Sequence, residues 1–307
     1  MRIVEQGSGP ALVLIPGIQG RWEYTRPAVD ALSSAFHVIT FSLCDEPSAD
    51  FAFDSSRGFS CYVQQVRAAL DRCRVDRAIV CGISFGGLVA LRFAVAHGDR
   101  IRGLVLASTP GPGWHLRRRH ELYARLPSLL GPLFLAETPW RLRREIAAAF
   151  PDVPARLHFA GLQLRTLFGA PPSFARMAGR ARMVATFDAA GDCARITAPT
   201  LVVTGEPALD RVVPVDGSIE YVSLIRGARS VVLERTGHLG WITRPADFAA
   251  IVRAFAGESS TDATRVGRVL SASAEASADR RSLGEGESRR SSPENHASGG
   301  GKDQACW

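Results

Sequence analysis

AIVCGISFGGLVALRF, residues 78–93, is the stretch that decides the fold of this chain. The apolar run 78–81 predicts a buried strand, the run 87–93 predicts a helix, and a G-x-S-x-G pattern centred on Ser84 joins them. At a sharp strand-to-helix turn, the serine is forced toward positive φ and its Oγ projects above the sheet. In a chain with 29 glycines the pentapeptide alone is a weak signal, but this context predicts that Ser84 is a nucleophile.

Further short apolar runs have the character of buried strands, at 11–15, 36–43, 103–107, 200–204 and 230–233. Nearly continuous Val, Ile and Leu runs of this kind are typical of a parallel sheet that is covered on both faces. Between them, apolar residues recur at helical spacing, as at Val63, Val66 and Leu70. Alternating strands and helices predict an α/β fold with a doubly wound, mostly parallel sheet.

The alternation is interrupted once, between residues 110 and 194. This stretch has helical patterns with prolines at their borders and no convincing strand, at 115–126, 140–150, 155–168 and 174–187. It predicts a helical insertion that divides a core into parts 1–109 and 195–256. In 257–307, apolar residues almost vanish. We expect a disordered tail there, because too little apolar surface is available to offset the entropy lost on ordering.

Composition excludes several classes of protein. The chain has 307 residues, 46% hydrophobic, enough for a sizeable core. No apolar run approaches the roughly 20 residues that span a bilayer, and no signal peptide is recognisable, so we expect a cytoplasmic protein with no membrane span. The net charge is +7, but Lys302 is the only lysine. Such an arginine bias is typical of genome composition, and without a basic stripe interleaved with aromatics we expect no nucleic-acid partner. The oligomeric state is left open.

The cysteines are scattered, with no C-x-x-C pair and no histidine at metal-ligand spacing. We expect them to be reduced, with Cys81 acting as a small buried hydrophobe in the strand that leads to Ser84. Neither a metal nor an organic cofactor is implied.

A serine nucleophile needs a base within hydrogen-bond reach, and a carboxylate must orient that base. Asp210 follows the strand at 200–204, and His238 follows the strand at 230–233 in a Gly-His turn. The carboxyl ends of parallel strands meet at one edge of a sheet, so both residues are expected at the edge that carries Ser84. We predict a catalytic set of Ser84, Asp210 and His238.

Each partner has competitors. Among the other histidines, none directly follows a late strand in a Gly-His turn; they are His37, His97, His115, His120, His158 and His296. Glu206 lies closer to the strand end than Asp210 but precedes Pro207, whereas Asp216 is expected to open a helix as its N-cap.

Acyl transfer also needs two donors for the developing oxyanion. The backbone N–H of Phe85 is one candidate, since it begins a helix whose dipole favours negative charge. The other is the N–H of Ile18, in the Gly-rich loop 16–20 after the first buried strand. Glycines in that loop let the backbone approach a substrate closely.

In these residues the chain resembles the α/β-hydrolase superfamily, specifically its cap-bearing, serine-triad branch of esterases, lactonases and carbon–carbon-bond hydrolases. The resemblance covers about residues 1–256 and rests on the segments 15–22, 82–87, 96–106, 210–214 and 237–238. It implies that 110–194 is a lid over the active site, inserted after the sixth strand. Serine at 84 speaks against the dehalogenase and epoxide hydrolase chemistries of aspartate-bearing members.

Three positions depart from the superfamily pattern. Pro16 replaces the common histidine before Gly17, which removes a side chain but leaves the backbone donor. The short start leaves little room for a first antiparallel hairpin, so we expect a truncated sheet edge or a start placed too late. Asp210 lies five residues after Gly205, a longer turn than the usual Gly-x-x-Asp.

The predicted function is a serine hydrolase that acts through an acyl-enzyme on a small-molecule carboxylic ester or lactone. The alternatives are a carbon–carbon-bond hydrolase, an acyltransferase, a cofactor-free perhydrolase, or a non-catalytic protein that kept the scaffold for ligand binding. Trp22, Trp114 and Trp140 are the candidate substrate contacts, although aromatic residues at helical spacing more often form core than pocket wall. Arginines of the insertion favour an anionic substrate.

Overall fold

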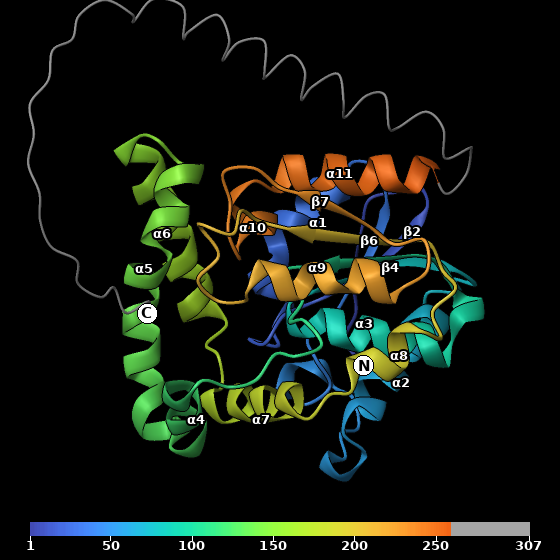
Figure 1. The fold of residues 1–307 in the computed structure, drawn as a ribbon, viewed down its shortest axis with the longest axis horizontal. Helices are drawn as coiled ribbons and strands as arrows, with labels where there is room; N and C mark the ends of the chain where they lie inside the picture. Colours follow the sequence, from blue (N-terminus) through green and yellow to red (C-terminus); the bar gives the residue numbers. More distant parts are fainter. Residues whose placement is uncertain (259–307) are drawn as a thin grey trace, which may run out of the picture. The chain divides into compact units, whose positions relative to one another are not determined.

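The computed structural model describes residues 1–258, in which a seven-stranded sheet has helices on both faces (Figure 1). The strand order is β1-β3-β2-β4-β5-β6-β7, and every neighbouring pair is parallel except β1 with β3. The strands are β1 (Val4–Gln6), β2 (Ala11–Ile15), β3 (His37–Thr40), β4 (Ala78–Ile83), β5 (Ile101–Ala107), β6 (Thr200–Thr204) and β7 (Arg229–Val232). The predicted mostly parallel α/β sheet is confirmed.

Helices occupy the intervals between successive strands from β2 onward, and α10 and α11 follow β7. The α-helices are α1 (Arg26–Leu32), α2 (Phe59–Arg72), α3 (Phe85–Ala96), α4 (Arg118–Arg125), α5 (Pro127–Ala149), α6 (Val153–Gly169), α7 (Phe174–Ala185), α8 (Ala189–Cys193), α9 (Val215–Leu224), α10 (Gly240–Thr243) and α11 (Pro245–Glu258). Short 3₁₀ helices are η1 (Trp22–Thr25), η2 (Pro47–Ala49), η3 (Ser55–Arg57) and η4 (Gly98–Arg100).

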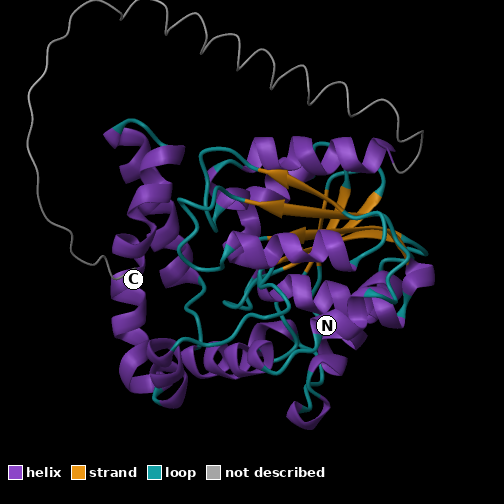
Figure 2. Cartoon of the chain, in the orientation of Figure 1, coloured by secondary structure: helices purple, strands orange, loops and turns teal. Residues whose placement is uncertain are grey.

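Each face of the sheet has its own core, and Figure 2 shows the helices on either side of the strands. Successive side chains of a strand point to opposite faces. Val80 therefore packs with residues of α2, α3 and α9, whereas the next residue, Cys81, packs with residues of α1 and α11. Both side chains are 0% exposed, which confirms the prediction for Cys81. A sheet covered on both faces explains the continuous apolar runs in the sequence.

Two features of the sheet differ from the expectations. Strand β1 was not predicted, because Val4–Gln6 is short, mostly exposed and polar, and so shows no apolar run. Five strands, β1 to β5, precede the helical insertion, so it follows the fifth strand and not the sixth. In the described sheet, β1 is the one antiparallel strand at its edge.

Helices α4 to α8 lie in the chain between β5 and β6, and we call them the inserted helices. The longest, α5, continues through Pro132 and Pro139, so the expectation that prolines mark helix borders is wrong here. A proline removes one helical hydrogen bond. Buried contacts on both sides compensate, because Gly131 packs against the Phe174 ring and Leu142 is buried.

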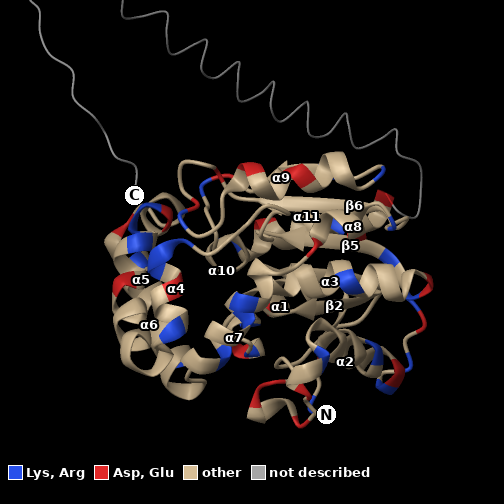
Figure 3. Cartoon of the chain, turned by 60° about the horizontal axis from the view of Figure 1, so that its bottom comes forward, with Lys and Arg blue, Asp and Glu red and all other residues tan. Residues whose placement is uncertain are grey.

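The inserted helices carry many basic positions, on α4, α5 and α7 in particular (Figure 3). Their outer surface also exposes large apolar side chains, among them Leu129, Leu157 and Phe168. Across residues 1–258 no helix has the length and apolarity needed to cross a membrane. The predicted disordered tail falls, from residue 259 onward, outside the residues that the structure describes.

Candidate active site

Ser84 stands at the junction of β4 and α3 in a strained backbone conformation. Its φ is 52° and its ψ is −117°, a combination that residues with a side chain rarely adopt. Its N–H donates to the Ala107 carbonyl at 2.8 Å, and its own carbonyl accepts from the Gly87 N–H at 2.9 Å. The predicted positive φ is therefore present, held by the neighbouring strand β5 and by the first turn of the helix.

Glycines make this turn possible. A Cβ on Gly82 would overlap the Gly86 carbonyl, and a Cβ on Gly86 would lie 2.6 Å from the Pro16 carbonyl oxygen. Neither contact can be relieved cheaply, because both obstacles are backbone. The G-x-S-x-G pattern thus reflects close approach between the two ends of the elbow and between the elbow and the loop after β2.

His238 and Asp210 are brought together from separate loops. His238 Nδ1 lies 3.4 Å from Asp210 Oδ2, and the two side chains are 8% and 2% exposed. A carboxylate can only accept, so Nδ1 is the donor in this contact, and in a neutral imidazole Nε2 is then the acceptor. The Trp241 ring stands edge-on to the imidazole at 5.5 Å between centroids. Within the described residues no hydrogen bond reaches Ser84 Oγ, a contact that often tightens only when substrate binds.

The orientation of Asp210 is set by its own loop. Its second oxygen, Oδ1, accepts the N–H groups of Val212 and Val213 at 2.8 and 2.9 Å. The loop lies against the histidine turn, where a Cβ on Gly237 would come within 2.6 Å of the Leu209 carbonyl oxygen. Because glycine alone fits there, the long turn after Gly205 still places its aspartate beside His238.

The competing carboxylates are engaged elsewhere. Glu206 Oε1 accepts the Arg235 N–H at 2.6 Å. Asp216 lies in the first turn of α9, but the N-cap position belongs to Pro214, so the expectation of an Asp216 cap is wrong. The N-cap lies two residues earlier than expected, at Pro214. Asp210 is the carboxylate that contacts His238.

The two expected oxyanion donors lie on either side of Ser84 in the chain. Phe85 is the first residue of α3, where the N–H has no partner within the helix. Ile18 follows Gly17, and a Cβ on Gly17 would lie 3.5 Å from Ser84 Cβ. The loop after β2 therefore passes directly beside the serine side chain.

A cavity of about 140 Å³ lies between the inserted helices and the loops of the site. Two residues near the site belong to its wall: Ile18, in the loop after β2, and Val212, two positions after Asp210. The remaining wall is mostly apolar: Trp114, Leu116, His120, Tyr123, Ala124, Pro127, Gly131, Phe134, Arg141, Phe174, Met177, Ala178 and Ala181. Burial, followed by repulsion from Arg141, lowers the pKa of His120, which favours its neutral form.

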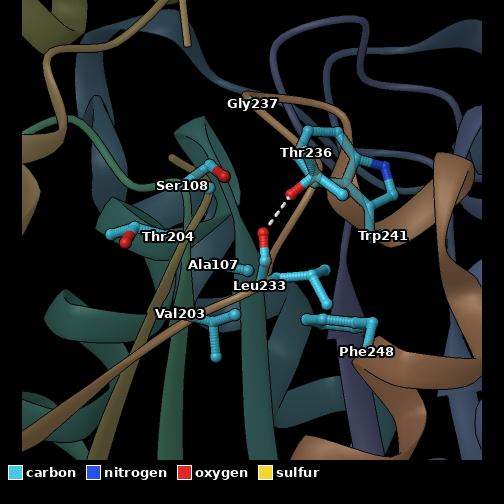
Figure 4. A pocket seen from close by; sticks show the side chains of 11 residues that line it. Ala107, Ser108, Val203, Thr204, Leu233, Thr236, Gly237, Trp241 and Phe248 are labelled. Atoms are coloured by element: carbon cyan, nitrogen blue, oxygen red, sulfur yellow. Dashed lines mark hydrogen bonds between the residues drawn. The ribbon is translucent and has the colours of Figure 1, made fainter. Parts of the chain in front are cut away.

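A second cavity lies behind the loop that carries His238 (Figure 4). The Thr236 hydroxyl donates to the Leu233 carbonyl there at 2.7 Å, and Ser108 and Trp241 also line it. Its volume of about 10 Å³ is no larger than one water molecule requires. It therefore has no room for a substrate group, unlike the cavity under the inserted helices.

Comparison with known proteins gives the family of this chain. Residues 12–251 match the sequence profile of the Alpha/beta hydrolase family. The chain belongs to this family. RutD of Pseudomonas syringae pv. syringae (strain B728a), provisionally named a carbamate hydrolase, is 25% identical over 262 residues, which cover 82% of this chain and 95% of RutD. The 2-hydroxymuconate semialdehyde hydrolase of Pseudomonas putida is 28% identical over 256 residues, covering 82% and 85%.

Solved structures of this kind include the enol-lactonase from Burkholderia xenovorans LB400. It has a TM-score of 0.68 to this chain at 23% identity, over 83% of this chain and 95% of the other. At that identity the likeness shows the alpha/beta hydrolase fold alone.

Sequence reasoning missed a buried acid beside the histidine turn of this alpha/beta hydrolase. Glu145, on α5, is 0% exposed, and its Oε1 accepts the Leu239 N–H at 2.6 Å, one residue after His238. Its Oε2 is buried without a hydrogen-bond partner. Burial raises the pKa of Glu145 to about 7, although backbone donors at Leu239 and Gly237 and the nearby His238 pull it down. Glu145 follows an arginine-rich run at 141–144, which is typical of a solvated helix face. No local signal therefore predicted that its side chain is buried.

The three candidate tryptophans lie in different surroundings. Trp114 lines the larger cavity. Trp140 is 70% exposed, with the Arg143 guanidinium 3.7 Å from its ring centroid, and Trp22 pairs with Arg26 in the same way at 4.6 Å. Neither Trp22 nor Trp140 belongs to the cavity wall.

Between residues 1 and 258, no group of three or more His, Cys, Asp and Glu side chains is arranged to hold an ion. The cysteines of that range, Cys44, Cys61, Cys73, Cys81 and Cys193, are free thiols.

Proposed function

We propose that this alpha/beta hydrolase is a serine hydrolase that forms an acyl-enzyme on Ser84 and acts on a small-molecule carboxylic ester or lactone. The observation that carries the proposal is the contact between His238 and Asp210 at the sheet edge where Ser84 holds a positive φ. Strain of this kind persists only where the surroundings enforce it, and it is concentrated at functional sites.

The reaction begins when His238 Nε2 accepts the hydroxyl proton of Ser84 while Oγ bonds to the carbonyl carbon. Asp210 keeps the imidazole in the correct tautomer and stabilises its cation. Collapse of the tetrahedral intermediate breaks the bond to the alkoxide, which takes the proton from His238. Water, deprotonated by His238, then attacks the acyl carbon and releases the acid and a free Ser84. With a lactone, the leaving hydroxyl stays attached to the acyl group.

The oxyanion is stabilised by the N–H groups of Ile18 and Phe85. One such donor, when removed, costs about 2.7–4 kcal/mol of barrier in serine hydrolysis. The close approach of Gly17 to Ser84 and the place of Phe85 at a helix N-terminus support this assignment.

The inserted helices, within residues 110–194, act as a lid that shapes the substrate site. Their cavity adjoins Ile18 and Val212, and its largely apolar wall supports an apolar acyl or alkyl group. Trp114 is the tryptophan that contacts substrate in this arrangement. Arg141 adds one cation to the wall, which supports a substrate that carries a carboxylate.

A carbon–carbon-bond hydrolase is the second candidate. The observation that favours it is the 28% identity to the Pseudomonas putida protein named 2-hydroxymuconate semialdehyde hydrolase. The same three side chains would serve, but the leaving group would be a carbanion that takes a proton and not an alkoxide.

Labelling with a fluorophosphonate tests the proposal. Wild-type protein should gain one covalent adduct on Ser84, and Ser84→Ala should gain none. Ser108 is the matched control, because it also has a positive φ and follows the neighbouring strand β5. Ser108→Ala should label as the wild type does. Loss of the adduct in Ser108→Ala with retention in Ser84→Ala would refute the assignment. Product analysis on esters, lactones and vinylogous diketones then separates the two candidates.

A further inference from the structure

The loop that carries Ile18 is a tight turn pinned by backbone contacts. The Gly20 N–H donates to the Gly17 carbonyl at 2.9 Å, and the Leu43 N–H donates to the Gly20 carbonyl at 2.7 Å. Gly20 has a φ of 77°, and a Cβ there would overlap the guanidinium of Arg180. The space against the turn is therefore filled by a side chain from a distant part of the chain.

Arg180 belongs to α7, one of the inserted helices, and its side chain is 0% exposed. Its Nη1 donates to the Ile18 carbonyl at 2.8 Å. Its Nη2 donates to Asp45 Oδ1 at 2.7 Å and to Glu46 Oε1 at 2.5 Å, and its Nε donates to Asp45 Oδ1 at 3.3 Å. Burying a cation is costly unless it is paired, and the two carboxylates after β3 supply that pairing.

The contact with Ile18 has a geometric consequence. A hydrogen bond to the Ile18 carbonyl holds the peptide unit between residues 18 and 19. The Ile18 N–H belongs to the preceding peptide unit, which is joined to it at the Ile18 Cα. Arginine presents its donors as a rigid planar fork, so its two carboxylate contacts define where the third donor points. Arg180 thus fixes the Ile18 carbonyl, which belongs to the same residue as the Ile18 N–H.

We propose that Arg180 is a positioning residue for the oxyanion hole, which it completes by holding the Ile18 loop from the lid side. The inference rests on the proposed function, in which the Ile18 N–H stabilises the oxyanion. Because Arg180 comes from α7, the donor is in place only while that helix lies against the loop. Lid position and transition-state stabilisation are then coupled through one guanidinium.

The test must separate positioning from simple anchoring of α7. Arg180→Met alone would leave Asp45 and Glu46 buried without their cation, so the main variant is D45N/E46Q/R180M, which removes all three charges. R180K is the second variant, since lysine keeps the charge but not the planar fork. Arg182→Met is the matched control, because Arg182 lies on the same helix and donates to the Ala124 carbonyl within the inserted helices.

Kinetics on an activated ester and on the corresponding thionoester provide the readout. We expect the triple variant to lose about 10- to 100-fold in kcat with KM changed less than about threefold, as for a misplaced catalytic group. R180K should lie between the triple variant and the wild type, and Arg182→Met should match the wild type. The kcat ratio of oxoester to thionoester should also fall, because a thiolate-like intermediate gains little from the oxyanion donors.

Anchoring alone would lower the melting temperature and leave that ratio unchanged. A folded triple variant that keeps the wild-type kcat and the wild-type oxoester-to-thionoester ratio overturns the inference. If the triple variant does not fold, a wild-type kcat and ratio in R180K overturn it. Wild-type protein that fails to label at Ser84 overturns the proposed function instead, so the two failures are distinguishable.

Discussion

Replacing Glu145 with glutamine should make the stability of this protein less dependent on pH. In the folded state, burial raises the pKa of Glu145 to about 7 from an ordinary value of 4.5. The folded protein therefore keeps a proton that the unfolded chain has released between these two values. Stability falls as pH rises through this window, and the full penalty is present above about pH 7.

The size of the effect follows from the difference between the two pKa values. At about 1.4 kcal/mol per pH unit, the change from 4.5 to about 7 amounts to about 3 kcal/mol. Glutamine has nearly the same shape and can still accept the Leu239 N–H, but it does not ionise. The free energy of unfolding of Glu145→Gln relative to wild type should therefore rise by about 3 kcal/mol between about pH 4 and pH 8.

Urea denaturation at a series of pH values measures this difference directly, and titrating groups that do not interact with residue 145 cancel in the comparison. Glu121→Gln is the control, since Glu121 is an exposed glutamate on the inserted helix α4, and its difference from wild type should stay flat. A flat difference for Glu145→Gln, or one that falls with pH, would show that the buried carboxylate does not carry the penalty.

Three further perturbations follow from the site. Asp210→Asn should lower kcat by about 10⁴-fold, because asparagine favours the wrong tautomer of His238. Glu206→Gln, the control, should keep kcat within about tenfold of wild type, and equal losses in the two variants would mean that Asp210 is not the triad acid. Gly87→Ala places a Cβ on the Thr109 hydroxyl and should cost about 1–3 kcal/mol in urea denaturation, and an unchanged midpoint would contradict this packing. Phe134→Ala enlarges the cavity of about 140 Å³, so kcat/KM should shift toward esters with bulkier acyl groups; a loss shared equally by acetate and bulky esters would place Phe134 outside the substrate site.

Local patterns predicted the elements whose character is set by near neighbours in the chain. The buried runs at β2 and β6 begin and end as expected, and the elbow at Ser84 has its positive φ because glycines surround it. Patterns failed where tertiary contacts override local preference. Helix α5 runs through Pro132 and Pro139, and the polar strand β1 exists because it pairs with β3.

Buried charges were the least predictable part of the site. Glu145 and Arg180 have the sequence signature of solvated helix faces, yet both are buried because their partners come from the other part of the chain. Glu145 meets the Leu239 N–H across 94 positions, and Arg180 meets the Ile18 carbonyl across 162. No window of sequence contains both members of either pair.

The sequence by itself determined the order of Ser84, Asp210 and His238 and predicted their place at one edge of a parallel sheet, because strand ends and glycine turns are local features. Only the tertiary structure decided how the inserted helices engage that edge. Their contacts depend on desolvated charges meeting backbone groups, and the energy of such a contact exists only once distant segments have packed together.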